Sequence, residues 1–307
     1  MFLGIDTSNY TTSLALFDGK NIIQRKKVLT VKKGERGLRQ SDAVFQHTVN
    51  MPLLMSELDF SSGIDSVGVS TRPRSVEGSY MPCFLVGENV ATAVSKTCNV
   101  PLYKTSHQVG HILAALYSAE RLDLINEKFI AFHLSGGTTE ALIVTPDKDD
   151  IVKCTLVASS SDLKAGQAVD RTGVLLGLDF PCGKELDALS EKSDREFNIK
   201  PSMQGINCSL SGVENKVKKM LADNESREDI AKFALSFVSA SVLEMCKRVI
   251  KEYGELPILF SGGVSSNSLL RKTINENLNA YFAESEFSLD NASGTAVYAY
   301  LKNEMNL

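Results

Sequence analysis

The chain has 307 residues, 43% of them hydrophobic and 23% charged, and its formal net charge at neutral pH is −4. This composition is that of a globular protein and excludes a largely disordered chain, and the length predicts two domains. The small acidic excess excludes attraction of the whole chain to nucleic acid or to an anionic membrane surface. Any such binding would need a local basic patch.

The sequence also carries signals about location. No apolar run reaches the roughly 18 residues that a membrane-spanning helix needs, and the opening residues, MFLGID, carry no basic start. We therefore expect neither a membrane segment nor a signal peptide. The six cysteines form no CxxC pair, which indicates reduced structural thiols and a cytoplasmic location.

The strongest internal pattern is a repeat. Residues 4–17 read GIDTSNYTTSLALF and residues 131–144 read AFHLSGGTTEALIV, at a constant offset. Each segment is a short apolar strand, a small polar turn and a second apolar strand, which predicts a β-hairpin in each half. One hairpin per half favours a duplicated two-domain fold, although two hairpins can also resemble each other by chance.

The remaining elements alternate between strand and helix. In chain order we expect a strand at Asp65–Ser70, a helix at Leu85–Cys98, a strand at Val100–Tyr103, a helix at Ser106–Ala119, a long amphipathic helix at Ile230–Glu252 and a strand at Pro257–Phe260. This alternation predicts an α/β fold. The weakest composition boundary, near 122–128, predicts domains 1–124 and 125–307, with a final helix at about 291–305 that packs against the first domain.

A third turn of small residues, Ser261-Gly262-Gly263, follows the strand at Pro257–Phe260 and precedes a predicted helix, Ser268–Leu278. A strand, a glycine turn and a helix place backbone N–H groups at a helix N-terminus, where anions bind. Tight turns need glycine for their own geometry, so that one such turn is weak support.

Two of the four histidines, His107 and His111, are four residues apart in HQVGHILAALYSA. On a helix they lie about 40° apart on one face, opposite an apolar stripe. Small residues beside them, Gly110, Ala114 and Ala115, would leave room for something to approach. Two imidazoles at this spacing can chelate a transition metal if a third ligand exists, and a solvated or capping pair is the alternative. Gln108 excludes the HExxH pattern of zinc proteases.

Seven motifs in this order resemble the tRNA N6-adenosine threonylcarbamoyltransferase family, TsaD, whose members were formerly described as glycoproteases. They are GIDTS at 4–8, HQVGH at 107–111, HLSGGTTEAL at 133–142, AGQAVDRTGVLLGLDFPCG at 165–183, SLSGVENKV at 209–217, SGGVSSNSLLR at 261–271 and SLDNASGTA at 288–296. The resemblance implies a duplicated actin-like ATPase fold of the ribonuclease H-like type, with a nucleotide cleft between its two domains.

The resemblance also implies site residues. His107, His111 and Asp290 match the metal ligands of the family, and two histidines with one carboxylate suit a single Fe²⁺ or Zn²⁺. The positions that match its nucleotide- and substrate-binding residues, for ATP, AMP or an acyl-adenylate, are Leu134, Ser135, Gly136, Gly137, Thr138, Asp170, Gly183, Gly262, Gly263 and Asn267. No side chain is an obvious general base, and Asp6 is the candidate for an auxiliary catalytic role.

The reaction implied is transfer of a threonylcarbamoyl group from threonylcarbamoyl-AMP to N6 of the adenosine beside the tRNA anticodon. A TsaB-like paralogue and a TsaE-like ATPase would be partners, and no membrane is involved. Several positions depart from the family pattern, namely Asn9, Tyr10, the 71–80 loop, Thr138, Lys164, Gln167 and Cys182. These departures indicate a divergent paralogue. They leave open a scaffold or regulator that binds nucleotide and metal, or transfer to another carbamoyl acceptor. A sugar kinase of the same fold has no signature here.

A basic stretch, Arg25–Arg39, holds seven cationic side chains against one acid. It could contact RNA phosphates, or it could be a solvated basic loop.

Overall fold

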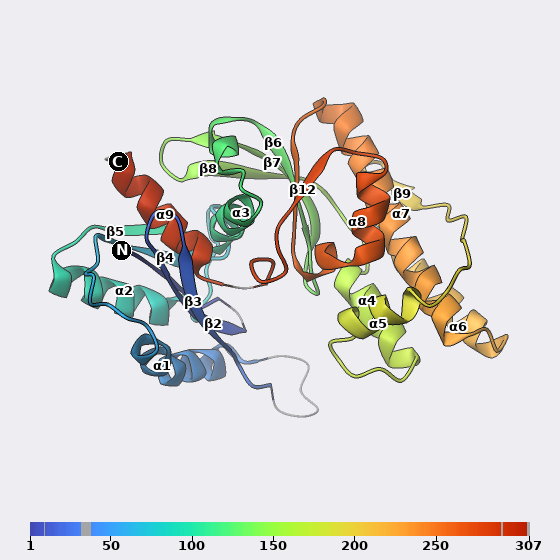
Figure 1. Cartoon of the computed structure of the whole chain (residues 1–307), viewed down its shortest axis with the longest axis horizontal. Helices are drawn as coiled ribbons and strands as arrows, with labels where there is room; N and C mark the ends of the chain where they lie inside the picture. The colour runs from blue at the N-terminus through green and yellow to red at the C-terminus, as the bar shows by residue number, and fades with distance from the viewer. Residues whose placement is uncertain (9, 32–37, 290, 306–307) are drawn as a thin grey trace. The chain divides into compact units, whose positions relative to one another are not determined.

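The computed structural model describes residues 1–8, 10–31, 38–289 and 291–305. The chain forms two compact units of mixed α/β structure, as expected from the alternating pattern (Figure 1). Unit 1 comprises Met1–Glu127, Thr145–Cys154 and Leu289–Leu307, and unit 2 comprises Lys128–Val144 and Thr155–Ser288.

The sheet of unit 1 has the strand order β3-β2-β1-β4-β5 among the described residues. Its strands are β1 (Phe2–Asp6), β2 (Thr11–Phe17), β3 (Ile22–Val28), β4 (Ser66–Arg72) and β5 (Leu102–Ser106). Strands β1 and β3 each pair antiparallel with β2, whereas β4 pairs in parallel with β1 and β5 in parallel with β4. Every residue of β1 and β2 is buried, because helices cover both faces of the sheet.

The helices of unit 1 are α1 (Gln40–Ser56), α2 (Phe84–Cys98), α3 (His107–Ser118) and α9 (Ser293–Glu304), with a 3₁₀ turn, η1 (Leu122–Asn126). Helix α9 packs on β1, β4 and α3 (Figure 1). The approach is backbone to backbone: a Cβ on Gly68 would overlap the Thr295 carbonyl, and a Cβ on Gly294 would overlap that of Gly110. The small residues expected to leave room for a close approach do so at Gly110, where α9 is the element that approaches.

The sheet of unit 2 repeats the same plan, with the order β8-β7-β6-β11-β12 among the described residues. Its strands are β6 (Phe129–Leu134), β7 (Thr139–Asp147), β8 (Ile151–Ser159), β11 (Ile258–Ser261) and β12 (Ala280–Phe282), and a small ribbon pairs β9 (Ser202–Gln204) with β10 (Asn207–Ser209). Strand β6 pairs antiparallel with β7 and parallel with β11, as β1 does with β2 and β4. The two predicted hairpins are thus confirmed as the first hairpins of two equivalent sheets.

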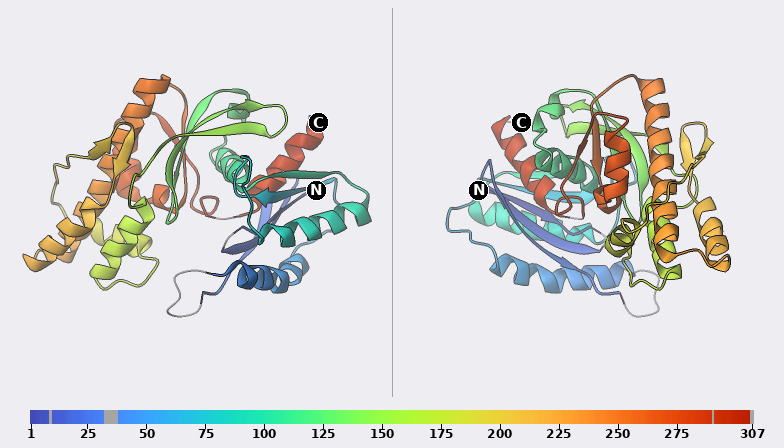
Figure 2. Two further views of the ribbon diagram at one scale, coloured as in Figure 1. Left: turned by 180° about the vertical axis from the view of Figure 1, so that it is seen from behind. Right: turned by 45° about the vertical axis from the view of Figure 1, so that its right-hand side comes forward.

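The helices of unit 2 are α4 (Ala165–Leu175), α5 (Gly183–Ser190), α6 (Gly212–Ala222), α7 (Arg227–Tyr253) and α8 (Ser268–Asn275), with a 3₁₀ turn, η2 (Gly263–Ser266). Helices α4, α5 and α6 lie beside the long helix α7 in both views of Figure 2. Side chains of α7 such as Phe237, Val242 and Met245 lie in the main core cluster, so the periodic pattern that predicted this helix reflects real burial.

The first part of the basic stretch Arg25–Arg39 is a strand and not a loop. Arg25, Lys26 and Lys27 lie in β3, which pairs along its whole length with β2. Lys32, Lys33 and Arg36 lie outside the described residues. No helix within the described part of the chain is both long and apolar enough to cross a membrane.

Candidate metal and nucleotide sites

The two histidines lie on the first turns of α3. The helix begins at His107 because Ser106, in extended conformation, accepts a hydrogen bond from the Val109 amide on its Oγ, at 3.3 Å. Val109, Ile112 and Leu113 are fully buried on the other side of the helix, which confirms the predicted core stripe. The imidazoles of His107 and His111 contact each other edge to face, with ring centroids 4.2 Å apart.

A buried carboxylate orients the first histidine. Asp6, at the end of β1 and 1% exposed, lies with its Oδ2 2.9 Å from Nδ1 of His107 and 2.6 Å from the Ser70 hydroxyl. Its Oδ1 accepts the Ser8 amide at 2.8 Å. Burial alone would raise the pKa of Asp6, but attraction to His107 and the hydrogen bonds outweigh it and hold this pKa below its usual value.

This contact settles the tautomer of His107. An ionised carboxylate only accepts hydrogen bonds, so Nδ1 of His107 donates to Asp6, and in the neutral imidazole the lone pair is then on Nε2. Metal-binding histidines characteristically donate their second nitrogen to a carboxylate in this way. The pair of histidines with Asp6 behind it therefore fits a transition metal. The third implied ligand, Asp290, lies outside the described residues, and within the described ranges no group of three or more His, Cys, Asp or Glu could hold a metal.

The predicted glycine turn of unit 2 is a tight connection between β6 and β7. The Ser135 amide donates to the Thr138 carbonyl at 2.7 Å, and the Thr138 amide donates to Ser135 Oγ at 3.1 Å. The first turn of α4 sits directly on it: the Gly166 amide donates to the Ser135 carbonyl, and a Cβ on Gly166 would lie 2.6 Å from the Cα of Gly136. Strand, turn and helix N-terminus form one rigid corner.

The third glycine turn packs on the same corner. Gly262 has a φ of 91°, in the left-handed region, and a Cβ there would overlap the carbonyl of buried Leu134. Only glycine can adopt this φ and also lie this close to the Leu134 carbonyl. Gly263 opens η2 immediately afterwards. The structure thus brings the predicted segments 134–138 and 262–263 together within unit 2.

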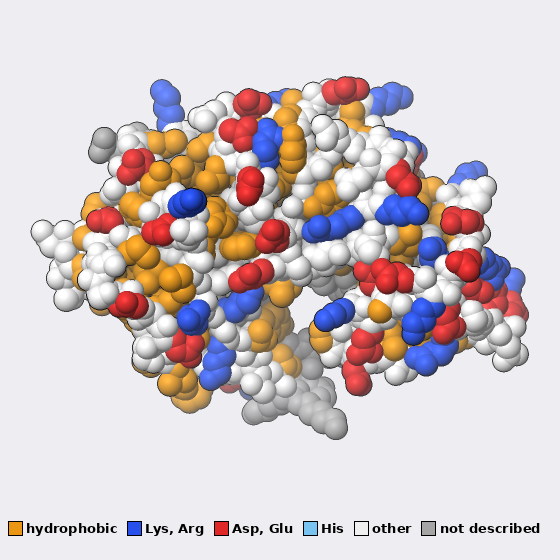
Figure 3. All heavy atoms as spheres, in the orientation of Figure 1, with side chains coloured by type: hydrophobic (Ala, Val, Ile, Leu, Met, Phe, Trp, Pro, Cys, Tyr) orange, Lys and Arg blue, Asp and Glu red, His pale blue; other side chains and the backbone are white. Residues whose placement is uncertain are grey.

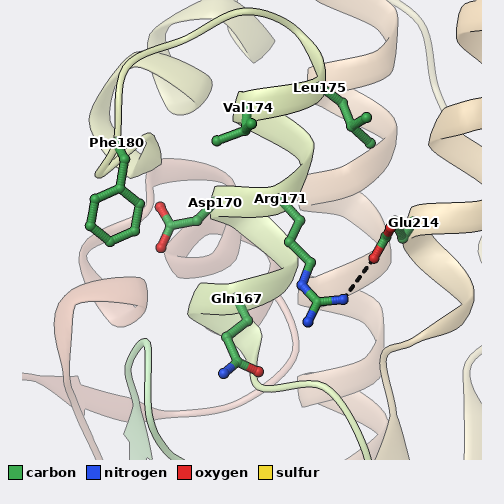
Figure 4. A pocket seen from close by; sticks show the side chains of 7 residues that line it. All are labelled: Gln167, Asp170, Arg171, Val174, Leu175, Phe180 and Glu214. Atoms are coloured by element: carbon green, nitrogen blue, oxygen red, sulfur yellow. Dashed lines mark hydrogen bonds and ion pairs between the residues drawn. The ribbon is translucent and has the colours of Figure 1, made fainter. Parts of the chain in front are cut away.

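A cavity of about 530 Å³ opens beside α4 (Figure 4). It is lined by Gln167, Asp170, Arg171, Val174, Leu175, Phe180 and Glu214. Its volume is in the range of small-molecule sites. The ring of Phe180 is 75% exposed, and Arg171 and Glu214 form an ion pair at 2.8 Å.

Asp170 lines this cavity and also accepts a hydrogen bond from the residue that precedes α5. Its Oδ1 accepts the amide of Cys182, the residue before Gly183, at 2.9 Å. Burial raises the pKa of Asp170 although this hydrogen bond opposes the change.

Comparison with known proteins shows which family this chain resembles. Residues 35–297 match the model of the family described as TsaD, tRNA N6-adenosine threonylcarbamoyltransferase. A protein of that name from Thermosipho africanus is 32% identical, over 97% of this chain and 93% of its own length. The chain belongs to the TsaD family.

Solved structures agree on the fold. Component A of (R)-2-hydroxyglutaryl-CoA dehydratase from Acidaminococcus fermentans is similar over 99% of this chain and 98% of its own, with a TM-score of 0.57 at 16% identity. A ROK family glucokinase from Streptomyces griseus is similar over 98% and 99%, with a TM-score of 0.56 at 10% identity. The chain therefore has the actin-like ATPase fold that the motifs of the TsaD family implied.

Asn267, matched to the adenosine motif of the TsaD family, has a local structural contact. Its Oδ1 accepts the Leu270 amide at 2.9 Å and caps α8. Asp170 is the one predicted site residue among those that line the cavity beside α4.

Sequence reasoning missed Arg171, Phe180 and Glu214 as cavity residues. They lie within the quoted motifs, but motif matching does not show which of their side chains point outward. One signal for Phe180 was present in the sequence. It stands beside a proline in the short segment LDFPCG, where few neighbouring residues could bury a phenylalanine ring.

Proposed function

We propose that this chain transfers a threonylcarbamoyl group from threonylcarbamoyl-AMP to N6 of the adenosine beside the tRNA anticodon, in a metal-dependent reaction. The observation that carries the proposal is His107, held by the buried carboxylate of Asp6 with His111 against its ring. A sugar kinase has no need of an imidazole pair oriented in this way. Membership of the TsaD family supports the same reaction.

The proposed metal ligands are His107, His111 and Asp290. A bound Fe²⁺ or Zn²⁺ would supply Lewis acidity at the carbonyl of the donor. The contribution of the chain is preorganisation: Asp6 fixes the tautomer and ring plane of His107, and Ser70 and Ser8 in turn fix Asp6. Because Asp6 is engaged on both oxygens, we assign it to orienting His107 rather than to accepting a proton.

The proposed nucleotide site is the corner of unit 2. The adenosine of ATP, AMP or the acyl-adenylate would occupy the cavity beside α4, with its base against the exposed ring of Phe180. Stacking of a base on an aromatic ring contributes about 1–3 kcal/mol. Asp170 would accept hydrogen bonds from ribose hydroxyls. The glycine turns at 135–138 and 262–263 would direct backbone N–H groups at the phosphate.

The proposed macromolecular partners are tRNA, a TsaB-like paralogue and a TsaE-like ATPase, in the cytoplasm. An exposed apolar stripe on α1 supports a protein partner: Phe45, Val49 and Leu53, spaced at i, i+4 and i+8, are 68%, 48% and 49% exposed. Hydrophobic side chains are visible over this helix at the lower left of Figure 3. A stripe of this kind fits the apolar face of a partner helix.

The test is a reconstituted reaction. Purified chain, synthetic threonylcarbamoyl-AMP, unmodified tRNA and the partner proteins are incubated, and the nucleosides are analysed by mass spectrometry. We expect threonylcarbamoyladenosine with the wild type and none with the His107→Ala/His111→Ala double variant. Gln108→Ala is the matched control, because Gln108 lies between the two histidines and its side chain makes no hydrogen bond in the described structure.

The same experiment separates the alternatives. Metal and nucleotide binding without any modified nucleoside would favour the scaffold, and modification of another acceptor would favour a different carbamoyl transfer.

A further inference from the structure

The turn between β7 and β8, which belongs to unit 1, carries a carboxylate that the proposed reaction does not use. Asp150 Oδ2 accepts hydrogen bonds from the Arg72 guanidinium at 3.1 Å and the Ser75 hydroxyl at 2.6 Å. Its Oδ1 accepts from the Tyr298 hydroxyl at 3.1 Å and the Thr105 hydroxyl at 3.4 Å. A carboxylate has about four acceptor sites, so this side chain is saturated by donors from distant parts of the sequence.

The backbone at this point carries a second sign of tight anchoring. Ile151, buried and β-branched, has a φ of 66°, in the left-handed region. Such a conformation costs free energy for a β-branched residue and persists only where the surrounding contacts fix it. The four hydrogen bonds of the neighbouring Asp150 side chain can fix the backbone at this point.

From Asp150 a chain of hydroxyls leads to the histidine helix. Ser75 Oγ lies 3.0 Å from Ser106 Oγ as well as 2.6 Å from Asp150. Because the carboxylate only accepts, the single proton of Ser75 goes to Asp150, and Ser106 donates to Ser75. The oxygen of Ser106 then accepts the Val109 amide and caps α3.

Ser75 lies in the loop at 72–79, and this loop also binds α3 through its own backbone. The Pro73 carbonyl accepts the amide of Gln108 at 3.0 Å, so that two amides of the first turn of α3 are bound by the 72–79 loop or by a hydroxyl attached to it. The pairing of β4 with β5 shifts register between Ser70 and Arg72, where this loop leaves the sheet. Bulges of this kind redirect side chains next to functional sites.

We propose that Asp150 and Ser75 are positioning residues for His107: through the 72–79 loop they hold the N-terminus of α3, while Asp6 holds the imidazole itself. The inference rests on the metal site of the proposed function. His107 lies between Ser106 and Gln108, which are both held by this loop. Loss of the Asp150 anchor lets the first turn of α3 shift, and the imidazole leaves the position set by Asp6.

The test compares Asp150→Asn and Ser75→Ala with Asp149→Asn. The control removes the same charge one residue away, from an exposed carboxylate for which the described structure shows no side-chain hydrogen bond or ion pair. In the metal-free protein, imidazole ¹H–¹⁵N spectra should show the Nδ1–H signal of His107 shifted in both variants and unchanged in the control. Ser75→Thr, which keeps the hydroxyl, should restore it.

Co²⁺ titration followed by visible absorption is the second measurement. The wild type should bind one Co²⁺ per chain, and Asp150→Asn and Ser75→Ala should weaken binding about tenfold or more with an altered spectrum, since outer partners of metal ligands have effects of this size. An unmoved His107 signal or unchanged Co²⁺ binding in Asp150→Asn overturns the inference while leaving the metal site in place. No Co²⁺ binding by the wild type overturns the proposed function, and the imidazole spectra then still decide whether Asp150 positions His107.

Discussion

The end of β1 in unit 1 and the end of β6 in unit 2 are equivalent positions in equivalent sheets, and they differ in the contacts that hold them. The first strand of unit 1 ends in Asp6, whose carboxylate is stabilised by hydrogen bonds from the His107 and Ser70 side chains and the Ser8 amide. The first strand of unit 2 ends in a glycine turn against which the backbone of α4 packs closely at Gly166. One fold therefore supports two chemistries, because a site resides in the residues placed on the sheet.

This difference predicts that the glycine corner at the end of β6 depends on shape, whereas the end of β1 depends on the charge of Asp6. The largest effect is expected for Gly262→Ala, where the added Cβ overlaps the Leu134 carbonyl and the φ is left-handed. Overpacking costs about 1–3 kcal/mol and the left-handed conformation about 1–2 kcal/mol, so we expect a loss of about 3 kcal/mol in urea unfolding. Gly136→Ala is the control, because a Cβ there meets no atom within 4 Å. Equal stability of the two variants would contradict the role of shape.

In unit 1 the corresponding change is Asp6→Asn, which keeps the size of the side chain and removes its charge. The amide no longer stabilises His107 as a carboxylate does, and we expect metal affinity to fall 10–100-fold, or about 1.4–2.8 kcal/mol. The measurement is Co²⁺ or Zn²⁺ titration, with Gln108→Ala as control. Wild-type affinity in Asp6→Asn would mean that the carboxylate has no part in metal binding.

Much of this arrangement could be predicted from local sequence, and the limit is informative. The hairpins, α7 and the two faces of α3 follow from spacing along the chain. The contact of Asp6 with His107, 101 residues apart, does not, because periodicity shows which face a residue occupies and not what lies opposite it.

Two further features could not be predicted from local sequence. Helix α1 was not predicted, since Pro52 lies inside it and apolar residues such as Phe45 lie on its exposed side. The occupant of the space at Gly110 is α9, from the far end of the chain.

A pH experiment tests the same comparison, because the pKa of Asp6 is lowered and the pKa of Asp170 is raised relative to their ordinary values. The folded-state pKa of Asp6 is lowered, so its stabilisation is present at neutral pH and is lost as the pH falls through that lowered pKa. The pKa of Asp170 is raised by burial, so its charge destabilises the folded protein at neutral pH, and this cost disappears below the ordinary value of 3.8.

The expected outcome is therefore opposite in sign. At pH 7, Asp6→Asn should lower the free energy of unfolding and Asp170→Asn should raise it slightly, and both differences should shrink as the pH falls. Asp170→Asn should meanwhile weaken AMP binding by about 1 kcal/mol, the value of one hydrogen bond. Urea unfolding at several pH values and calorimetry with AMP are the measurements, and a destabilised Asp170→Asn at pH 7 would contradict the assignment.

The smallest effect is expected for the ion pair across the cavity of unit 2, between Arg171 and Glu214. Its side chains are 57% and 25% exposed, and Glu214 also pairs with Lys218 at 2.6 Å. Exposed pairs contribute about 0.2–1 kcal/mol, so a double-mutant cycle with Arg171→Gln and Glu214→Gln should give a coupling energy in that range. Because the screening length falls from about 10 Å at 0.1 M salt to about 3 Å at 1 M, the coupling should nearly vanish at high salt. A coupling well above 1 kcal/mol that persists at 1 M salt would show that charge also governs unit 2, and the contrast between the two strand ends would then hold only for the glycine corner.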